Sequence, residues 1–140
     1  MLLYLDSSVA LRAALPGAQR DSWRRWVDAM AATHGALVSA RLLRTEVVRA
    51  LRREGLALRE GNKVLSRIRL LAVTENTFVV AESIERHIKT LDSLHLAAAL
   101  LLGRPLVVAT HDAAMADVAL TLGLEVVDPV GEDNVPIAIP

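Results

Sequence analysis

Short apolar runs alternate along the chain with longer stretches of helical periodicity, and this alternation is the feature that most constrains the fold. The apolar runs lie at residues 2–5, 36–39, 70–73, 106–109 and 125–127. Runs of this kind are typical of parallel strands, which are buried on both faces and covered by the helices between them. We therefore predict an α/β fold with three layers, α/β/α, around a five-stranded parallel sheet.

The helical stretches show apolar residues at spacings of three and four and often end at glycine or proline. The stretch 92–102 is apolar on nearly all sides, which is typical of a buried helix. No repeat or linker interrupts the pattern, so we predict one domain over residues 1–128 and an extended, proline-containing tail over 129–140. The predicted helices span 7–15, 21–32, 42–54, 57–69, 75–88, 92–102 and 112–122.

Composition and charge exclude several classes of protein. The 140 residues contain no cysteine, which rules out disulfide scaffolds, zinc fingers, iron–sulfur sites and thiol catalysis. Sixteen basic and sixteen acidic side chains cancel, which argues against binding nucleic acid by bulk attraction. The longest apolar run has seven residues and no basic cluster precedes Asp6, so we expect a cytoplasmic protein without a membrane span.

The charge is unevenly distributed along the chain. Residues 41–69 carry nine basic side chains and only three acidic ones, and the remainder of the chain has the opposite excess. A phosphate-facing patch beside an acidic pocket would produce this polarity. Two ordinary solvated helix faces would produce it as well, and both interpretations stay open.

Four acidic residues are expected at the same end of the sheet. Asp6 follows the first strand, Asp112 comes three residues after the fourth, and Asp92 begins the buried helix. Parallel strands place ligands beyond their carboxyl ends. Helix capping explains each aspartate taken alone. It does not explain Glu46, which lies in the first turns of the helix after the second strand and interrupts an apolar face, so we predict a shared acidic pocket.

Such a pocket favours a metal ion. Two carboxylates about 4 Å apart repel each other by about 4 kcal/mol at an effective dielectric constant of 20. Several of them would therefore take up protons or bind a divalent cation. Clustered oxygen ligands without cysteine suit Mg²⁺ or Mn²⁺ better than Zn²⁺. An ion of this kind activates water and neutralises phosphate, which phosphodiester hydrolysis requires.

The segments that carry these acids resemble PIN-domain ribonucleases, specifically the VapC-type toxins of toxin–antitoxin pairs. The resemblance covers residues 1–128, in the order and with the spacing of the family. It implies a Mg²⁺- or Mn²⁺-dependent endoribonuclease that hydrolyses RNA, acts as the toxin of a type II pair with a cognate antitoxin, and forms a homodimer. The four segments are Leu3–Ser8 (LYLDSS), Thr45–Leu51 (TEVVRAL), Leu91–Ala97 (LDSLHLA) and Thr110–Asp112 (THD).

The resemblance also implies roles for individual residues. Asp6, Asp92 and Asp112 would be the metal ligands, and Glu46 would hold or polarise a water molecule on the metal. The hydroxyl groups expected to hydrogen-bond these acids belong to Ser7 and Thr110. From their proximity to Glu46 in the sequence, the expected RNA phosphate contacts are Arg41, Arg44 and Arg49.

Other polar and aromatic residues have simpler interpretations. His95 lies on the same helix face as Asp92; it is interpreted either as a general acid or as a hydrogen-bonded core residue. We expect His111 at the surface and Asp117 in solvent. Trp23 and Trp26 are expected in the core or in a groove for the antitoxin.

Three other functions of small α/β domains need to be weighed against this one. A DNA structure-specific nuclease with this fold is usually longer and has more acids. A catalytically silent PIN-like module that binds RNA or protein would have no need of all four acids. A phosphoacceptor receiver domain is excluded, because its third strand would end in aspartate rather than run into Thr74, and because no lysine follows Lys89.

Overall fold

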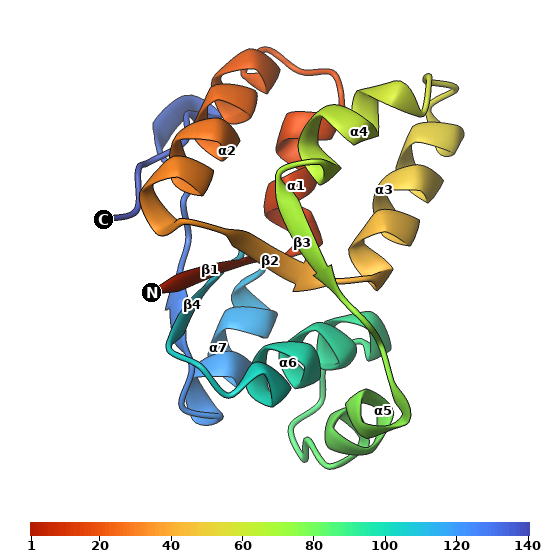
Figure 1. Ribbon diagram of the computed structural model, residues 1–140, viewed down its shortest axis with the longest axis vertical. Helices are drawn as coiled ribbons and strands as arrows, with labels where there is room; N and C mark the ends of the chain where they lie inside the picture. Colours follow the sequence, from red (N-terminus) through yellow and green to blue (C-terminus); the bar gives the residue numbers. More distant parts are fainter.

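The computed structural model describes all 140 residues and contains a five-stranded sheet in which every pairing is parallel (Figure 1). The order of the strands across the sheet is β3-β2-β1-β4-β5. The predicted three-layer α/β/α architecture is therefore confirmed. The strands are β1 (Leu2–Leu5), β2 (Leu37–Ala40), β3 (Ile68–Leu71), β4 (Leu106–Ala109) and β5 (Glu125–Val127).

The helices are divided between the two faces of the sheet (Figure 1). The chain first moves from β1 outward to β3, then passes back across β1 to β4 and β5. Right-handed crossovers in these two directions place their helices on opposite faces. One face carries α1 (Ser7–Ala14), α2 (Arg20–His34), α3 (Leu42–Arg53) and α4 (Arg59–Leu65), and the other carries α5 (Glu75–Glu82), α6 (Thr90–Leu102) and α7 (Ala113–Thr121).

Two helices are shorter than their apolar pattern predicts. Helix α4 ends at Leu65 rather than at residue 69, because Ile68 is already part of β3, where it is buried and paired with Leu37. Strand β3 consequently begins two residues before the predicted 70–73. Helix α5 ends at Glu82 rather than at residue 88. The apolar side chains Ile84 and Ile88 that suggested its continuation pack on the core from irregular backbone.

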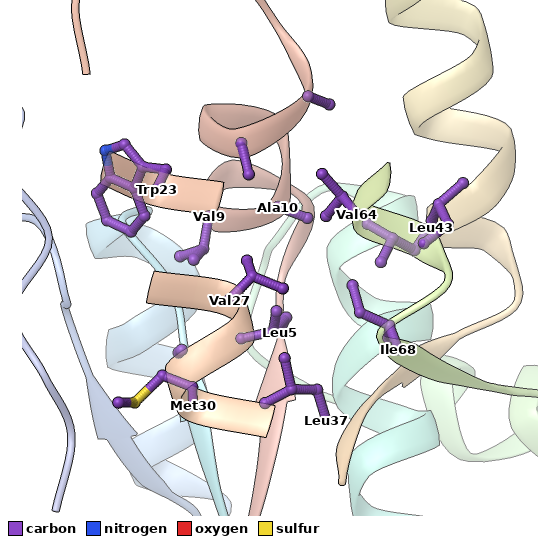
Figure 2. Packing of buried hydrophobic residues seen from close by; sticks show 14 of the residues in the cluster. Leu5, Val9, Ala10, Trp23, Val27, Met30, Leu37, Leu43, Val64 and Ile68 are labelled. Atoms are coloured by element: carbon purple, nitrogen blue, oxygen red, sulfur yellow. The ribbon is translucent and has the colours of Figure 1, made fainter. Parts of the chain in front are cut away.

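The alternating side chains of β1 divide the core into two clusters. Leu3 and Leu5 join 17 other buried residues beneath α1 to α4, among them Val27 and Trp23 (Figure 2). Tyr4 belongs to a second cluster of 11 buried residues, to which α6 and α7 contribute. The side chains of Leu3, Tyr4 and Leu5 are completely buried. A shift of the strand by one residue would exchange the faces of every side chain, so burial holds the register.

The tail after Asp128 packs along α2. Trp23 donates its indole N–H to the carbonyl of Asn134 at 2.9 Å, and Trp26 donates to the carbonyl of Ile137 at 2.8 Å. The tail is mostly extended apart from a short 3-10 turn at Glu132–Asn134. Ile139 is only 6% exposed and belongs to the larger core cluster. Both tryptophans are core residues that also hold the tail. None of the helices combines the length and hydrophobicity needed to cross a lipid bilayer.

We expect Ile139→Ala to lower the free energy of unfolding by about 2 kcal/mol or more, because it removes a buried aliphatic side chain. The matched control is Ile137→Ala in the same segment, where the side chain is 54% exposed and the loss should stay within about 0.5 kcal/mol. Urea denaturation followed by tryptophan fluorescence measures both. Equal losses for the two variants would show that the tail is not anchored by Ile139.

Candidate active site

An open pocket of about 370 Å³ lies where strands β1 and β4 end. These two central strands are adjacent, and the chain leaves them in opposite directions across the sheet. Ligands bind at such a switch point in open parallel sheets. All four predicted acids line the pocket, namely Asp6, Glu46, Asp92 and Asp112.

Asp6 joins the ends of the two central strands. Its Oδ2 accepts hydrogen bonds from the hydroxyl of Ser8 at 2.7 Å and from the hydroxyl of Thr110 at 2.9 Å. Through Ser8 the residue also caps α1. Asp6 is 2% exposed, and its second oxygen, Oδ1, is buried without any hydrogen-bond partner in the protein. Leaving a buried acceptor unpaired costs about 1–3 kcal/mol or more. The unpaired oxygen of Asp6 is therefore suited to contact a bound ligand.

Asp112 is held by the same hydrogen-bond network. Its Oδ1 accepts from the backbone N–H of Met115 at 3.1 Å, which caps α7. Its own backbone N–H donates to the hydroxyl oxygen of Thr110 at 3.0 Å. Thr110 therefore connects Asp6 with Asp112 through two hydrogen bonds.

Asp92 reaches the pocket from α6. The helix begins at Thr90, so Asp92 lies inside its first turn rather than at its start, and Lys89 occupies the cap position. Burial, together with the negative charges of Asp6 and Asp112, raises the pKa of Asp92 to about 6. The pocket thus concentrates negative charge, which Lys89 in its lining offsets only in part.

The donor set fits a hard cation that keeps part of its water. No three acidic or histidine side chains lie close enough to bind one ion together. Mg²⁺ dehydrates reluctantly and commonly uses only one or two direct carboxylates. The pocket volume of about 370 Å³ gives room for such an ion, and the unpaired Oδ1 of Asp6 and the raised pKa of Asp92 indicate negative charge that it would offset.

Glu46 is the acid that helix capping does not explain, and its partner is His95. The imidazole Nε2 lies 2.6 Å from Oε1 of Glu46. His95 is completely buried, and the side chain of Glu46 is 17% exposed. Of the two interpretations of His95, the hydrogen-bonded core residue is the one observed, but one of its two partners is a pocket acid. Two features of the sequence could have indicated this contact, namely a single histidine in an apolar helix and a single glutamate on an apolar helix face.

The structure places the other predicted residues with mixed outcomes. The hydroxyl that contacts Asp6 belongs to Ser8, whereas Ser7 lines the pocket and makes no hydrogen bond to Asp6. His111 is exposed, contacting Asp128, and Asp117 is exposed in solvent, both as predicted. The cation that lines the pocket is Lys89. The three arginines predicted to contact phosphate are exposed outside the pocket lining, namely Arg41, Arg44 and Arg49.

Comparison with known proteins places this fold and pocket in a family. The family model of the PIN domain matches residues 3–120. The chain belongs to the PIN-domain family. It is 36% identical over 130 residues to Ribonuclease VapC46 of Mycobacterium tuberculosis, an alignment that covers 91% of this chain and 97% of the relative.

Two crystal structures resemble this PIN domain in fold. The first is VapBC2 from Rickettsia felis bound to a DNA fragment from their promoter, with a TM-score of 0.69 and 12% identity over 91% of this chain and 98% of that one. The second is FitAcB from Neisseria gonorrhoeae, with a TM-score of 0.56 and 20% identity over 92% of this chain and 98% of that one. At these identities the likeness shows a shared fold.

We expect Asp92→Asn to stabilise the metal-free PIN domain at pH 7 by about 1 kcal/mol, a value reduced for the partial exposure of this side chain. The pKa of Asp92 in the folded state is about 6, against an ordinary value of 3.8. Between these values the folded state binds more protons than the unfolded state, so wild-type stability falls as the pH rises from about 4 to 6.

Urea denaturation in EDTA across this pH range measures the effect. Asp117→Asn, on exposed α7 surface, is the matched control and should leave the pH profile unchanged. If Asp92→Asn lost stability at pH 7, the carboxylate would have a supporting role in the fold rather than being held against repulsion.

Proposed function

We propose that this PIN domain is a metal-dependent endoribonuclease that acts as the toxin of a toxin–antitoxin pair. One observation carries the proposal: four acids from four separate segments line a single pocket at the switch point of the sheet. The chain is also 36% identical to a protein named as a ribonuclease, along nearly its whole length. Retention of all four acids weighs against a silent binding module.

We assign a proposed role to each acid of the pocket. Asp6, Asp92 and Asp112 would hold Mg²⁺, partly through water molecules that the ion keeps, and Mn²⁺ is a substitute. When bound, such an ion activates water and neutralises charge on the phosphate. Hydrogen bonds from Ser8 and Thr110 occupy Oδ2 of Asp6 and leave Oδ1 available as a ligand. Glu46 lies on α3, whereas Asp92 lies on α6, and Glu46 would orient the attacking water.

RNA phosphates would be bound around the rim of the pocket. Lys89 lines the pocket at the start of α6 and offsets part of the charge that RNA would meet there. We propose that Arg41, Arg44 and Arg49 contact phosphates further along the strand. They are exposed and lie on or beside α3, the helix that carries Glu46. Arginine is well suited to this role because its planar guanidinium matches phosphate oxygens in pairs.

The proposed partners are an antitoxin and a second copy of the chain. Structures with this fold include VapBC and FitAB assemblies, which supports the antitoxin. Large apolar side chains are exposed on α5 and at the start of α6, namely Phe78, Val79 and Leu91. Exposed apolar side chains on neighbouring helices can contribute to a protein interface, and on this basis we propose a homodimer. Action on cellular RNA would place the protein in the cytoplasm.

We expect the purified protein to cleave RNA in the presence of Mg²⁺ or Mn²⁺. Cleavage should stop in EDTA and recover when either ion is restored in excess. Asp6→Asn and Asp92→Asn should abolish cleavage, because each removes a charged ligand while keeping the shape of the side chain. Gel analysis of total RNA and of a labelled oligonucleotide measures the products, and Asp117→Asn is the matched acidic control.

Cleavage that persisted in EDTA, or in both pocket variants, would overturn the proposed chemistry. Cleavage of branched DNA with intact RNA would point instead to the DNA nuclease alternative. A circular dichroism spectrum and melting temperature for each variant establish that loss of activity does not arise from unfolding.

We expect expression of this chain alone to slow growth and degrade RNA, and co-expression with a small DNA-binding protein encoded beside it to prevent both effects. Growth curves and RNA integrity measure the outcome, and the Asp92→Asn variant is the control for catalytic toxicity. Light scattering of the purified chain and of the co-purified complex measures the stoichiometry. Normal growth with high expression of active nuclease would contradict the toxin role.

A further inference from the structure

A chain of buried hydrogen bonds runs from the sheet to Glu46. The backbone N–H of Ala40, at the end of β2, donates to the phenolic oxygen of Tyr4 at 3.0 Å. That oxygen lies 2.7 Å from Nδ1 of His95, and Nε2 of His95 lies 2.6 Å from Oε1 of Glu46. These hydrogen bonds connect the two helix layers, because Glu46 and His95 belong to α3 and α6 on opposite faces of the sheet (Figure 1).

The donors and acceptors of this chain fit one direction. Tyr4 receives a hydrogen from Ala40, so its own hydroxyl hydrogen is free to be donated to Nδ1 of His95. With Nδ1 accepting, the ring hydrogen belongs on Nε2, where it is donated to Glu46.

The surroundings hold the ring of His95 in place. Tyr4 and His95 are both completely buried, and their rings meet edge to face at 84° with centroids 5.8 Å apart. The histidine therefore presents a single N–H to Glu46 in a fixed orientation. That contact occupies Oε1, while Glu46 itself lines the acid pocket.

We propose that Tyr4 and His95 are positioning residues for Glu46: Tyr4 sets the ring tautomer of His95, and His95 fixes the carboxylate of Glu46 with one oxygen turned to the pocket. This inference rests on the proposed nuclease function. Neither residue lines the pocket, so each acts through Glu46 rather than on the RNA. Partners of this kind typically change activity by about ten- to a hundred-fold when removed.

The first test is kinetic and uses the full chain with Mn²⁺ and a labelled RNA. Tyr4→Phe and His95→Leu should each lower kcat by about ten-fold or more and leave KM unchanged, because RNA binding does not involve them. His95→Gln should recover part of the loss, since its amide can donate to Glu46 in the place of Nε2.

The control for stability is Thr77→Val. Thr77 is buried, accepts a hydrogen bond from the N–H of Thr74 at the start of α5, and lies outside the acid pocket. It should lower the melting temperature without lowering kcat. If Tyr4→Phe lost melting temperature like Thr77→Val while keeping wild-type kcat, Tyr4 would be a core residue only and the proposal would be overturned.

The second test does not depend on activity. Long-range ¹H–¹⁵N correlation spectra of the metal-free protein report which nitrogen of each histidine carries hydrogen. The wild type should show His95 protonated at Nε2 and bare at Nδ1, and Tyr4→Phe should lose this single fixed tautomer. Hydrogen on Nδ1 in the wild type, or an unchanged spectrum in Tyr4→Phe, would overturn the proposal. Because the spectra need no RNA, they remain decisive if the nuclease proposal itself fails.

Discussion

The central position of β1 is the constraint on which the site depends. Leu3, Tyr4 and Leu5 are fully buried on alternating faces of the sheet, and β1 is paired with a neighbouring strand on both sides. The register of β1 is therefore fixed, and the position of the residue that follows the strand is fixed with it. Asp6 occupies that place, between the ends of β1 and β4, and Tyr4 points from the same strand to the face where His95 lies. Core packing and the geometry of the pocket are thus set by one short segment.

Capping and ligand binding turn out to be compatible roles for the same carboxylate. Asp6 and Asp112 each use one oxygen to cap the helix that follows. A cap fixes the rotamer of the side chain, because a backbone N–H receives a hydrogen bond only from a narrow range of positions. The unpaired Oδ1 of Asp6 is consequently held in position before any ion arrives. A site prepared in this way loses little side-chain freedom on binding.

The sequence could predict what depends on periodicity and on the ends of elements. Strands β1, β4 and β5 have the predicted bounds, and the four acids meet at one edge because parallel strands all end there. It could not predict where α5 stops, since Ile84 and Ile88 keep a helical spacing in irregular backbone. Nor could it separate Ser7 from Ser8, whose difference depends on the turn into α1. The hydrogen bond between Glu46 and His95 joins residues 49 positions apart. Its existence depends on how the folded chain places α3 relative to α6, which the sequence pattern does not specify.

The burial of Ile139 in the same cluster as Leu3 has a consequence for synthesis of the protein. A nascent chain that has left the ribosome as far as residue 100 lacks β4, one of the two strands that flank β1, and lacks the tail that covers Trp23 and Trp26. Contacts this distant in sequence form late. The acids of the pocket can therefore gather only after β4 and Asp112 have left the ribosome, which delays the assembled site relative to the helices that precede them.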